Sequence, residues 1–146
     1  MTYSYSKDGN KQIAKNFKVK EFRCKDGTDK IEIDMGLVNI LQMIRDKFNS
    51  SLNINSAYRT ESYNKKIGGS STSKHCLGMA CDFTVKGVPV EIVAMYVHTI
   101  FPKTLGIEVA ENGSYIHIDT RTKKWRAWTK SGGSQYTTVS NLFPKK

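Results

Sequence analysis

Two stretches of the sequence decide the fold of this chain: SKHCLGMACD (Ser73–Asp82) and YIHID (Tyr115–Asp119). Each runs into a predicted strand, because apolar residues alternate there with the period of two that a half-buried strand requires. In the strand predicted over Met79–Val85, the apolar side chains share one face and Asp82 lies on the other. In the second strand His117 lies opposite two isoleucines in the same way. Burial of the apolar faces therefore brings Asp82 and His117 together on the opposite face of the sheet.

The rest of the chain supplies helices and strands that complete such a sheet. The expected helices are Met35–Phe48 with Asp34 as N-cap, a short turn over Glu61–Ile67, and an apolar helix that opens at Pro89–Glu91 and ends before Pro102. The other expected strands are Leu52–Ser56 and two hairpin partners, Leu105–Ala110 and Tyr115–Thr120. We therefore predict an α+β fold, with a small antiparallel sheet, helices packed on one side of it, and a metal site on the other face.

The length of 146 residues suits one domain with one core. We expect a loosely ordered basic arm over residues 1–16, the folded domain over 17–128 and a basic C-terminal tail over 129–146. No apolar run approaches the roughly 20 residues of a membrane span, and the first residues lack the apolar segment of a signal peptide. We therefore expect synthesis in the cytoplasm without a signal peptide. The 3 cysteines contain no CxxC pair, which predicts free thiols.

The formal net charge of +10 favours an anionic partner. The lysines are scattered and concentrated near the two ends, without a basic helix or an RNA-binding aromatic strand. We therefore predict no specific nucleic-acid partner, and a steeply salt-dependent affinity for DNA would contradict this. A negatively charged cell wall would attract this positive charge as well as a nucleic acid would. The alternative is that the charge only keeps the protein soluble.

His75 lies in the loop before the first strand and can join Asp82 and His117 as a third ligand. Two imidazoles and one carboxylate with an open fourth position are typical of a catalytic zinc site. Each residue also has an ordinary interpretation: an exposed loop histidine, a hydrogen-bonded strand carboxylate, and a histidine on the wet face of an edge strand. From the residues alone, both interpretations stay open.

The motif Ser73-x-His75-x-x-Gly78-x-Ala80-x-Asp82, followed by His117-x-Asp119, resembles the signature of the zinc D-alanyl-D-alanine carboxypeptidase family. That family includes related phage and bacterial endopeptidases of peptidoglycan. Two further segments, Asn16–Cys24 and Asn55–Thr60, resemble the opening segment and the S-x-Y-R-[ST] motif of its members. The resemblance covers roughly residues 16–128, with four motifs in the family's order.

The resemblance implies that His75, Asp82 and His117 bind Zn²⁺. It further implies that Arg59 holds the carbonyl oxygen or carboxylate of the substrate, where a guanidinium stabilises a developing oxyanion. Ser73 is implied as a loop-shaping residue that also contributes to substrate binding. A surface salt bridge is the plain alternative for Arg59.

The general base is where the chain departs from the family. Several members carry an acid three residues before the last histidine, and here that residue is Ser114, which cannot act as a base. We predict that Glu111, at the hairpin, or Asp119, two residues after His117, takes this catalytic role. A solvated turn residue is the alternative for Glu111, and orientation of a histidine or of Arg121 is the alternative for Asp119.

These features together predict a monomeric zinc metallopeptidase that hydrolyses peptidoglycan stem peptides, as a D-Ala-D-Ala carboxypeptidase or as an endopeptidase. Such a protein would act at the cell wall, as a phage or prophage lysin reaching it by lysis, by a holin or in a phage particle. The alternative is a non-catalytic module that keeps the zinc and only binds peptidoglycan, and the Ser114 departure keeps that alternative open.

Overall fold

The computed structural model describes residues 1–102, 104–121, 126–131 and 135–138. Its strands are β1 (Thr2–Ser4), β2 (Gln12–Ala14), β3 (Phe17–Lys18), β4 (Lys30–Glu32), β5 (Leu52–Ser56), β6 (Ala80–Val85), β7 (Gly106–Ala110), β8 (Ile116–Asp119), β9 (Arg126–Ser131) and β10 (Gln135–Thr138). Its helices are α1 (Tyr5–Asp8), α2 (Met35–Phe48), α3 (Glu61–Lys66) and α4 (Val90–Ile100), with 3₁₀ turns η1 (Val19–Phe22) and η2 (Lys74–Leu77). The α+β class is confirmed.

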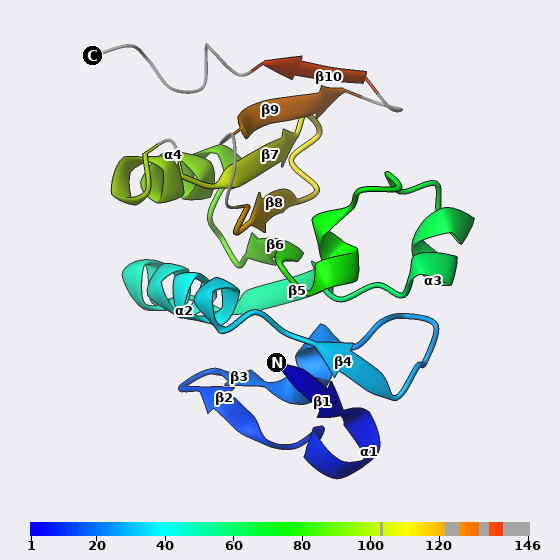
Figure 1. The fold of residues 1–146 in the computed structure, drawn as a ribbon. Coiled ribbons are helices and arrows are strands. Elements are labelled where there is room, and N and C mark those ends of the chain that lie inside the picture. The colour runs from blue at the N-terminus through cyan, green and yellow to red at the C-terminus, as the bar shows by residue number, and fades with distance from the viewer. Residues whose placement is uncertain (103, 122–125, 132–134, 139–146) are drawn as a thin grey trace.

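The main sheet has 6 strands in the order β10-β9-β7-β8-β6-β5. Every neighbouring pair is antiparallel except β7 and β9, which run parallel. Figure 1 shows these strands stacked through the middle of the molecule, with α2 and α4 together on one side and α3 away from them. The hairpin predicted from the alternating pattern corresponds to β7 and β8, and the sheet is extended beyond it by β9 and β10.

Helix α2 begins and ends where the sequence predicts. The Asp34 side chain accepts a hydrogen bond from the Leu37 N–H at 3.2 Å, which satisfies one of the free donors of the first turn. Asn49 ends the helix in the left-handed conformation, with φ of 45°. The apolar face of α2 packs with α4 against one face of the sheet, and this core includes Leu37, Leu41, Val93, Val97, Cys81, Phe83, Ile116 and Ile118.

The register of the central strands positions the functional face. Asp82 on β6 is paired with His117 on β8, and His117 is paired in turn with Glu108 on β7. Because directly opposed residues of antiparallel strands point to the same face, these three side chains form a row across three adjacent strands. Ser56 on β5 extends the row at its other end, opposite Asp82.

The structure corrects the expectation that residues 1–16 are a loosely ordered arm. β1 pairs with β4, and Tyr3 is 8 % exposed within the core. The amino terminus of Met1 donates a hydrogen bond to the Ile33 carbonyl oxygen at 2.7 Å. The polar composition of the segment conceals this order, since its strand partner lies far along the chain.

The expected boundary between domain and tail at residue 128 falls inside β9 (Arg126–Ser131). Residues 135–138 form β10 and pair with β9, so this part of the predicted tail belongs to the sheet. Residues 132–134 and 139–146 of that tail lie outside the described part of the chain. Within the described ranges, no helix has both the length and the apolar character needed to cross a bilayer.

Candidate metal centre

Three side chains able to bind a metal meet on the face of the sheet opposite the core. His75 lies in η2, Asp82 on β6 and His117 on β8. One ligand atom from each residue can be chosen so that all lie within 4.8 Å of one another. The structure thus brings together the three residues that the sequence singles out as metal ligands.

The arrangement of these donor atoms suits zinc. His75 Nε2 lies 3.2 Å from Asp82 Oδ1, and His117 Nδ1 lies 2.8 Å from the same oxygen. A tetrahedral zinc ion with ligand bonds of about 2.0–2.2 Å holds its ligand atoms about 3.3–3.6 Å apart. The separation at His75 is close to an edge of such a tetrahedron, and the separation at His117 is shorter, at hydrogen-bond distance. Two imidazoles and one carboxylate leave a fourth position for water or substrate, as in catalytic zinc sites.

The His75 ring is fixed by the backbone of the loop that precedes α3. Its Nδ1 lies 2.6 Å from the Ala57 carbonyl oxygen, which can only accept a hydrogen bond. Nδ1 therefore carries the proton, and Nε2 is left as the ligand atom facing Asp82. The backbone of η2 is held as well, because the Ser73 hydroxyl accepts from the His75 N–H and the Arg59 N–H donates to the His75 carbonyl oxygen.

Gly78 connects η2 to β6 and explains why the motif carries glycine there. Its φ of 71° lies in the left-handed region that favours glycine. A Cβ atom at this position would also lie closer than 3.0 Å to the backbone of Glu32. The turn and the close approach of β4 together exclude a larger residue.

The His117 ring is fixed from behind by a buried ion pair. Its Nε2 lies 2.8 Å from Asp119 Oδ2, which leaves Nδ1 as the atom that faces Asp82. Arg121 donates from Nε and Nη2 to the two Asp119 oxygens, both at 2.7 Å. Asp119 is only 1 % exposed, and Gly106 opposite it leaves the room that the ion pair fills.

The charges of this cluster shift its pKa values strongly. Burial disfavours charged Asp82, yet hydrogen bonds from His117 and His75 outweigh burial and hold the pKa of Asp82 well below its usual range. Burial likewise disfavours charged His117, but hydrogen bonds to Asp119 and Asp82 raise the pKa of His117 to about 9. Burial also opposes the charge of Asp119, and Arg121 and His117 hold the pKa of Asp119 below its usual range. The raised pKa of His117 means that a metal bound at this ring would take the place of a proton.

Arg59 lies beside the ligands and is held in place by three hydrogen bonds. It donates from Nε to Ser56 Oγ at 3.0 Å, from Nη1 to Asn64 Oδ1 at 3.3 Å and from Nη2 to Asp82 Oδ2 at 3.3 Å. A guanidinium has five N–H donors, so two remain for a substrate. Asn64 is 3 % exposed and also donates to the Ser70 carbonyl oxygen, which joins Arg59 to the loop after α3.

Comparison with protein-family models gives a match over residues 14–119, well over half of the chain, to the family described as peptidase M15. The chain belongs to the peptidase M15 family. This is the zinc D-Ala-D-Ala carboxypeptidase-type family to which the motifs point, and the matched region contains all three candidate ligands. No curated protein matches the chain.

The two candidates for the general base of this M15 peptidase, Asp119 and Glu111, lie in different surroundings. Both oxygens of Asp119 are engaged by Arg121 and His117 behind the metal site. Glu111 lies exposed in the turn of the β7–β8 hairpin, as does Ser114. Neither carboxylate belongs to the group of three that can hold a metal.

Three polar residues of the M15 site are not predicted from the sequence: Ser56, Asn64 and Glu108. Ser56 and Asn64 accept hydrogen bonds from Arg59 because the loop folds back on itself, and local sequence patterns do not predict such a fold. Glu108 carries a usable signal, because a hairpin turn over residues 111–114 pairs residue 110 with 115 and therefore 108 with 117. Counting back from the turn places Glu108 directly opposite His117, as observed.

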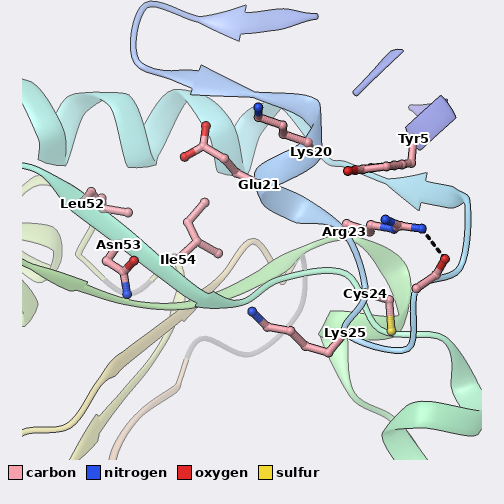
Figure 2. A pocket seen from close by; sticks show the side chains of 10 residues that line it. Tyr5, Lys20, Glu21, Arg23, Cys24, Lys25, Leu52, Asn53 and Ile54 are labelled. Atoms are coloured by element: carbon pink, nitrogen blue, oxygen red, sulfur yellow. Dashed lines mark hydrogen bonds between the residues drawn. The ribbon is translucent and has the colours of Figure 1, made fainter. Parts of the chain in front are cut away.

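A cavity of about 490 Å³ lies apart from the three ligands, between the N-terminal segment and β5. Figure 2 shows Arg23 over the Tyr5 ring at its rim, with a hydrogen bond from Arg23 to the Gly27 carbonyl oxygen. None of the candidate ligands lines this cavity.

Proposed function

We propose that this M15 peptidase hydrolyses peptide bonds in peptidoglycan stem peptides, either at a terminal D-Ala-D-Ala bond or within the peptide. The observation that carries the proposal is the convergence of His75, Asp82 and His117, with each imidazole turned by a second hydrogen bond so that one ring nitrogen faces the Asp82 carboxylate. Metal-ligating histidines characteristically have such a hydrogen bond at the second ring nitrogen, which fixes the tautomer and the direction of the ring. A zinc ion held by these residues supplies Lewis-acid activation of a water molecule and of a substrate carbonyl.

The residues around the ligands take distinct roles in the proposal. Arg59 binds the substrate carbonyl oxygen or carboxylate with its two remaining N–H donors, as a preorganised positive charge that costs no reorganisation during the reaction. Ser73 contributes by shaping the loop at His75, since its hydroxyl already accepts the His75 N–H. Asp119 holds His117 in the tautomer that leaves Nδ1 free for the metal.

The charge of the chain fits an anionic cell wall as the place of action, and a lysin of phage or prophage origin is the proposed context. The formal charge of +10 would raise the rate of encounter with such a polymer and make binding sensitive to salt. A monomer suffices for this role, because all three candidate ligands come from one chain.

The experiment that tests the function is mass spectrometry of muropeptides before and after incubation with the zinc-loaded protein, with and without a chelator. Hydrolysis is expected to release free amino groups or D-alanine, and the chelator is expected to abolish the release. The mass of the products identifies the bond. About one zinc per chain with no change in the muropeptides would instead favour the non-catalytic binding module, which the exposed Ser114 at the usual position of the base supports.

A further inference from the structure

Glu108 is a buried carboxylate on the functional face that the ligand set does not use. It lies in the middle of β7 and is 7 % exposed. Burial of a carboxylate is costly without compensating partners, so glutamate is rarely found at such a position without a reason. Its place in the sheet supplies that reason.

The strand register places Glu108 beside the metal ligands. Glu108 is the Cα partner of His117, which is itself the partner of Asp82 on the next strand. Opposed residues in an antiparallel pair have Cα atoms about 4.5–5.5 Å apart and point to the same face. Glu108 therefore borders the cluster from the β7 side without being one of the three residues that can hold the metal.

The contacts that the structure describes for Glu108 hold one carboxylate oxygen and leave the other open. The Tyr115 hydroxyl donates to Glu108 Oε1 at 2.8 Å. Among the residues that the structure describes, no hydrogen bond or ion pair reaches Oε2. A carboxylate that is anchored on one side and open on the other is suited to exchanging a proton with a bound water or substrate.

We propose that Glu108 is the proton-transfer residue of the hydrolysis, a role that rests on the proposed peptidase function. Oε2 accepts a proton as an O–H bond of the attacking water breaks and its oxygen bonds to the carbonyl carbon. The same proton passes to the amide nitrogen as the C–N bond breaks. Water is thereby added across the peptide bond, Glu108 returns to its carboxylate form, and no oxidant or reductant is needed.

Glu108 fits this role better than Asp119 or Glu111, the two carboxylates that the sequence offers as a general base. Both oxygens of Asp119 are committed to Arg121 and His117, and Glu111 lies exposed in the hairpin turn. Of the three, only Glu108 is buried on the ligand face with an oxygen that no described residue contacts.

The test compares E108Q with the matched variant E91Q, which makes the same chemical change on α4, on the core side of the sheet away from the ligands. With muropeptides as the substrate, E108Q is expected to lower kcat by about 10²–10⁴-fold, the usual contribution of a general acid or base. It is expected to keep zinc at the wild-type stoichiometry and to bind the uncleaved muropeptide with unchanged affinity, measured by calorimetry. E91Q is expected to stay within about twofold of the wild type.

A second variant guards against simple misfolding of E108Q. Glu108→Ala is expected to be equally slow and to recover part of its activity when formate is added, because a small carboxylic acid can replace the missing proton carrier but cannot repair a fold. E108Q with wild-type kcat would overturn the inference, as would loss of zinc from both variants or E108A without formate rescue. A zinc-loaded wild type that cleaves no muropeptide would refute the peptidase function itself, so the two failures are distinguishable.

Discussion

The two halves of the metal site are held by different means. Asp82 and His117 lie on neighbouring strands, where four consecutive Cα pairs between β6 and β8 fix their spacing. His75 and Arg59 lie on the segment between β5 and β6, where individual hydrogen bonds fix them. We call these the sheet half and the loop half.

The two histidines show what the difference means. The His75 ring is oriented by a backbone carbonyl oxygen, which no substitution of a side chain removes. The His117 ring is oriented by the Asp119 carboxylate, which in turn depends on Arg121 and on the space at Gly106. In the sheet half, the strand pairing fixes the backbone, but the orientation of the His117 ring depends on side chains that a substitution can remove. In the loop half, a backbone carbonyl fixes the His75 ring, but the path of the backbone depends on side-chain hydrogen bonds.

The largest effect is expected from removal of one ligand in each half. His75→Ala and His117→Ala should each weaken zinc binding by more than about 100-fold, since a lost ligand costs more than the 10–100-fold typical of a lost outer partner. Muropeptide hydrolysis should fall below detection in both. Competition with a chromogenic chelator measures the affinity. His98→Gln, on α4, is the control and should bind zinc as the wild type does, whereas a ligand variant that kept its zinc would show that its histidine is not a ligand.

A smaller effect is expected from Gly106→Ala, which disturbs only the ion pair that orients His117 in the sheet half. The new Cβ atom would lie closer than 3.0 Å to both Asp119 oxygens and to Arg121 Nε, so the ion pair must move away from His117. Zinc affinity should fall by about 10–100-fold, as for other losses of an outer hydrogen bond. Gly36→Ala, in the first turn of α2, is the matched change outside the site and should leave zinc binding intact. Unchanged affinity in Gly106→Ala would show that Asp119 does not position the ring.

The same division explains how far the sequence predicts the molecule. Alternation placed Asp82 and His117 on one face because strand geometry is local and periodic, and the ladder then brings them together. The same reasoning, extended by counting from the hairpin turn, would have found Glu108. The residues that hold His75 and Arg59 in the loop half have no periodic spacing in the sequence. The roles of the Ala57 carbonyl and the Asn64 side chain can therefore be recognised only in the folded structure.

The N-terminal residues illustrate the same limit. Each strand there is only 2 or 3 residues long, and β1 pairs with β4, whose residues lie 26 to 30 positions further on in the register. Such pairing leaves no local pattern, and the polar composition of the first 16 residues then suggests disorder. Tertiary contact, not local propensity, orders this segment.

In the loop half, Asn64→Ala should separate substrate handling from metal binding. Its loss removes the partner of Arg59 Nη1 and the hydrogen bond to Ser70, which frees the guanidinium and the loop after α3. Zinc affinity should stay within about threefold, because the Ala57 carbonyl still orients His75. Truncation of a buried hydrogen-bonded group of this kind costs about 1–3 kcal/mol, so kcat/KM should fall roughly tenfold. Equal losses of zinc and of activity would show that the two halves are not separable.

The smallest effect is expected from Asp26→Asn, at the outer edge of the loop half. Asp26 accepts hydrogen bonds from the Thr60 hydroxyl at 2.7 Å and from the Thr28 N–H at 2.9 Å, and Thr60 caps the start of α3. These hydrogen bonds, that of Thr60 first, hold the pKa of Asp26 below its usual range.

A carboxyl group whose pKa is lower in the folded than in the unfolded chain stabilises the fold above its unfolded pKa of about 3.9. That stabilisation disappears as the pH falls below this value toward the folded pKa. The wild type should therefore be slightly more stable than Asp26→Asn at pH 7, with the difference shrinking below about pH 4, and urea unfolding at several pH values measures it. The effect should be small because Asp26 is exposed and solvent screens its charge. A difference that does not change with pH would mean that Asp26 acts through the shape of its hydrogen bonds alone, and the loop half would then depend on geometry without any contribution from charge at this edge.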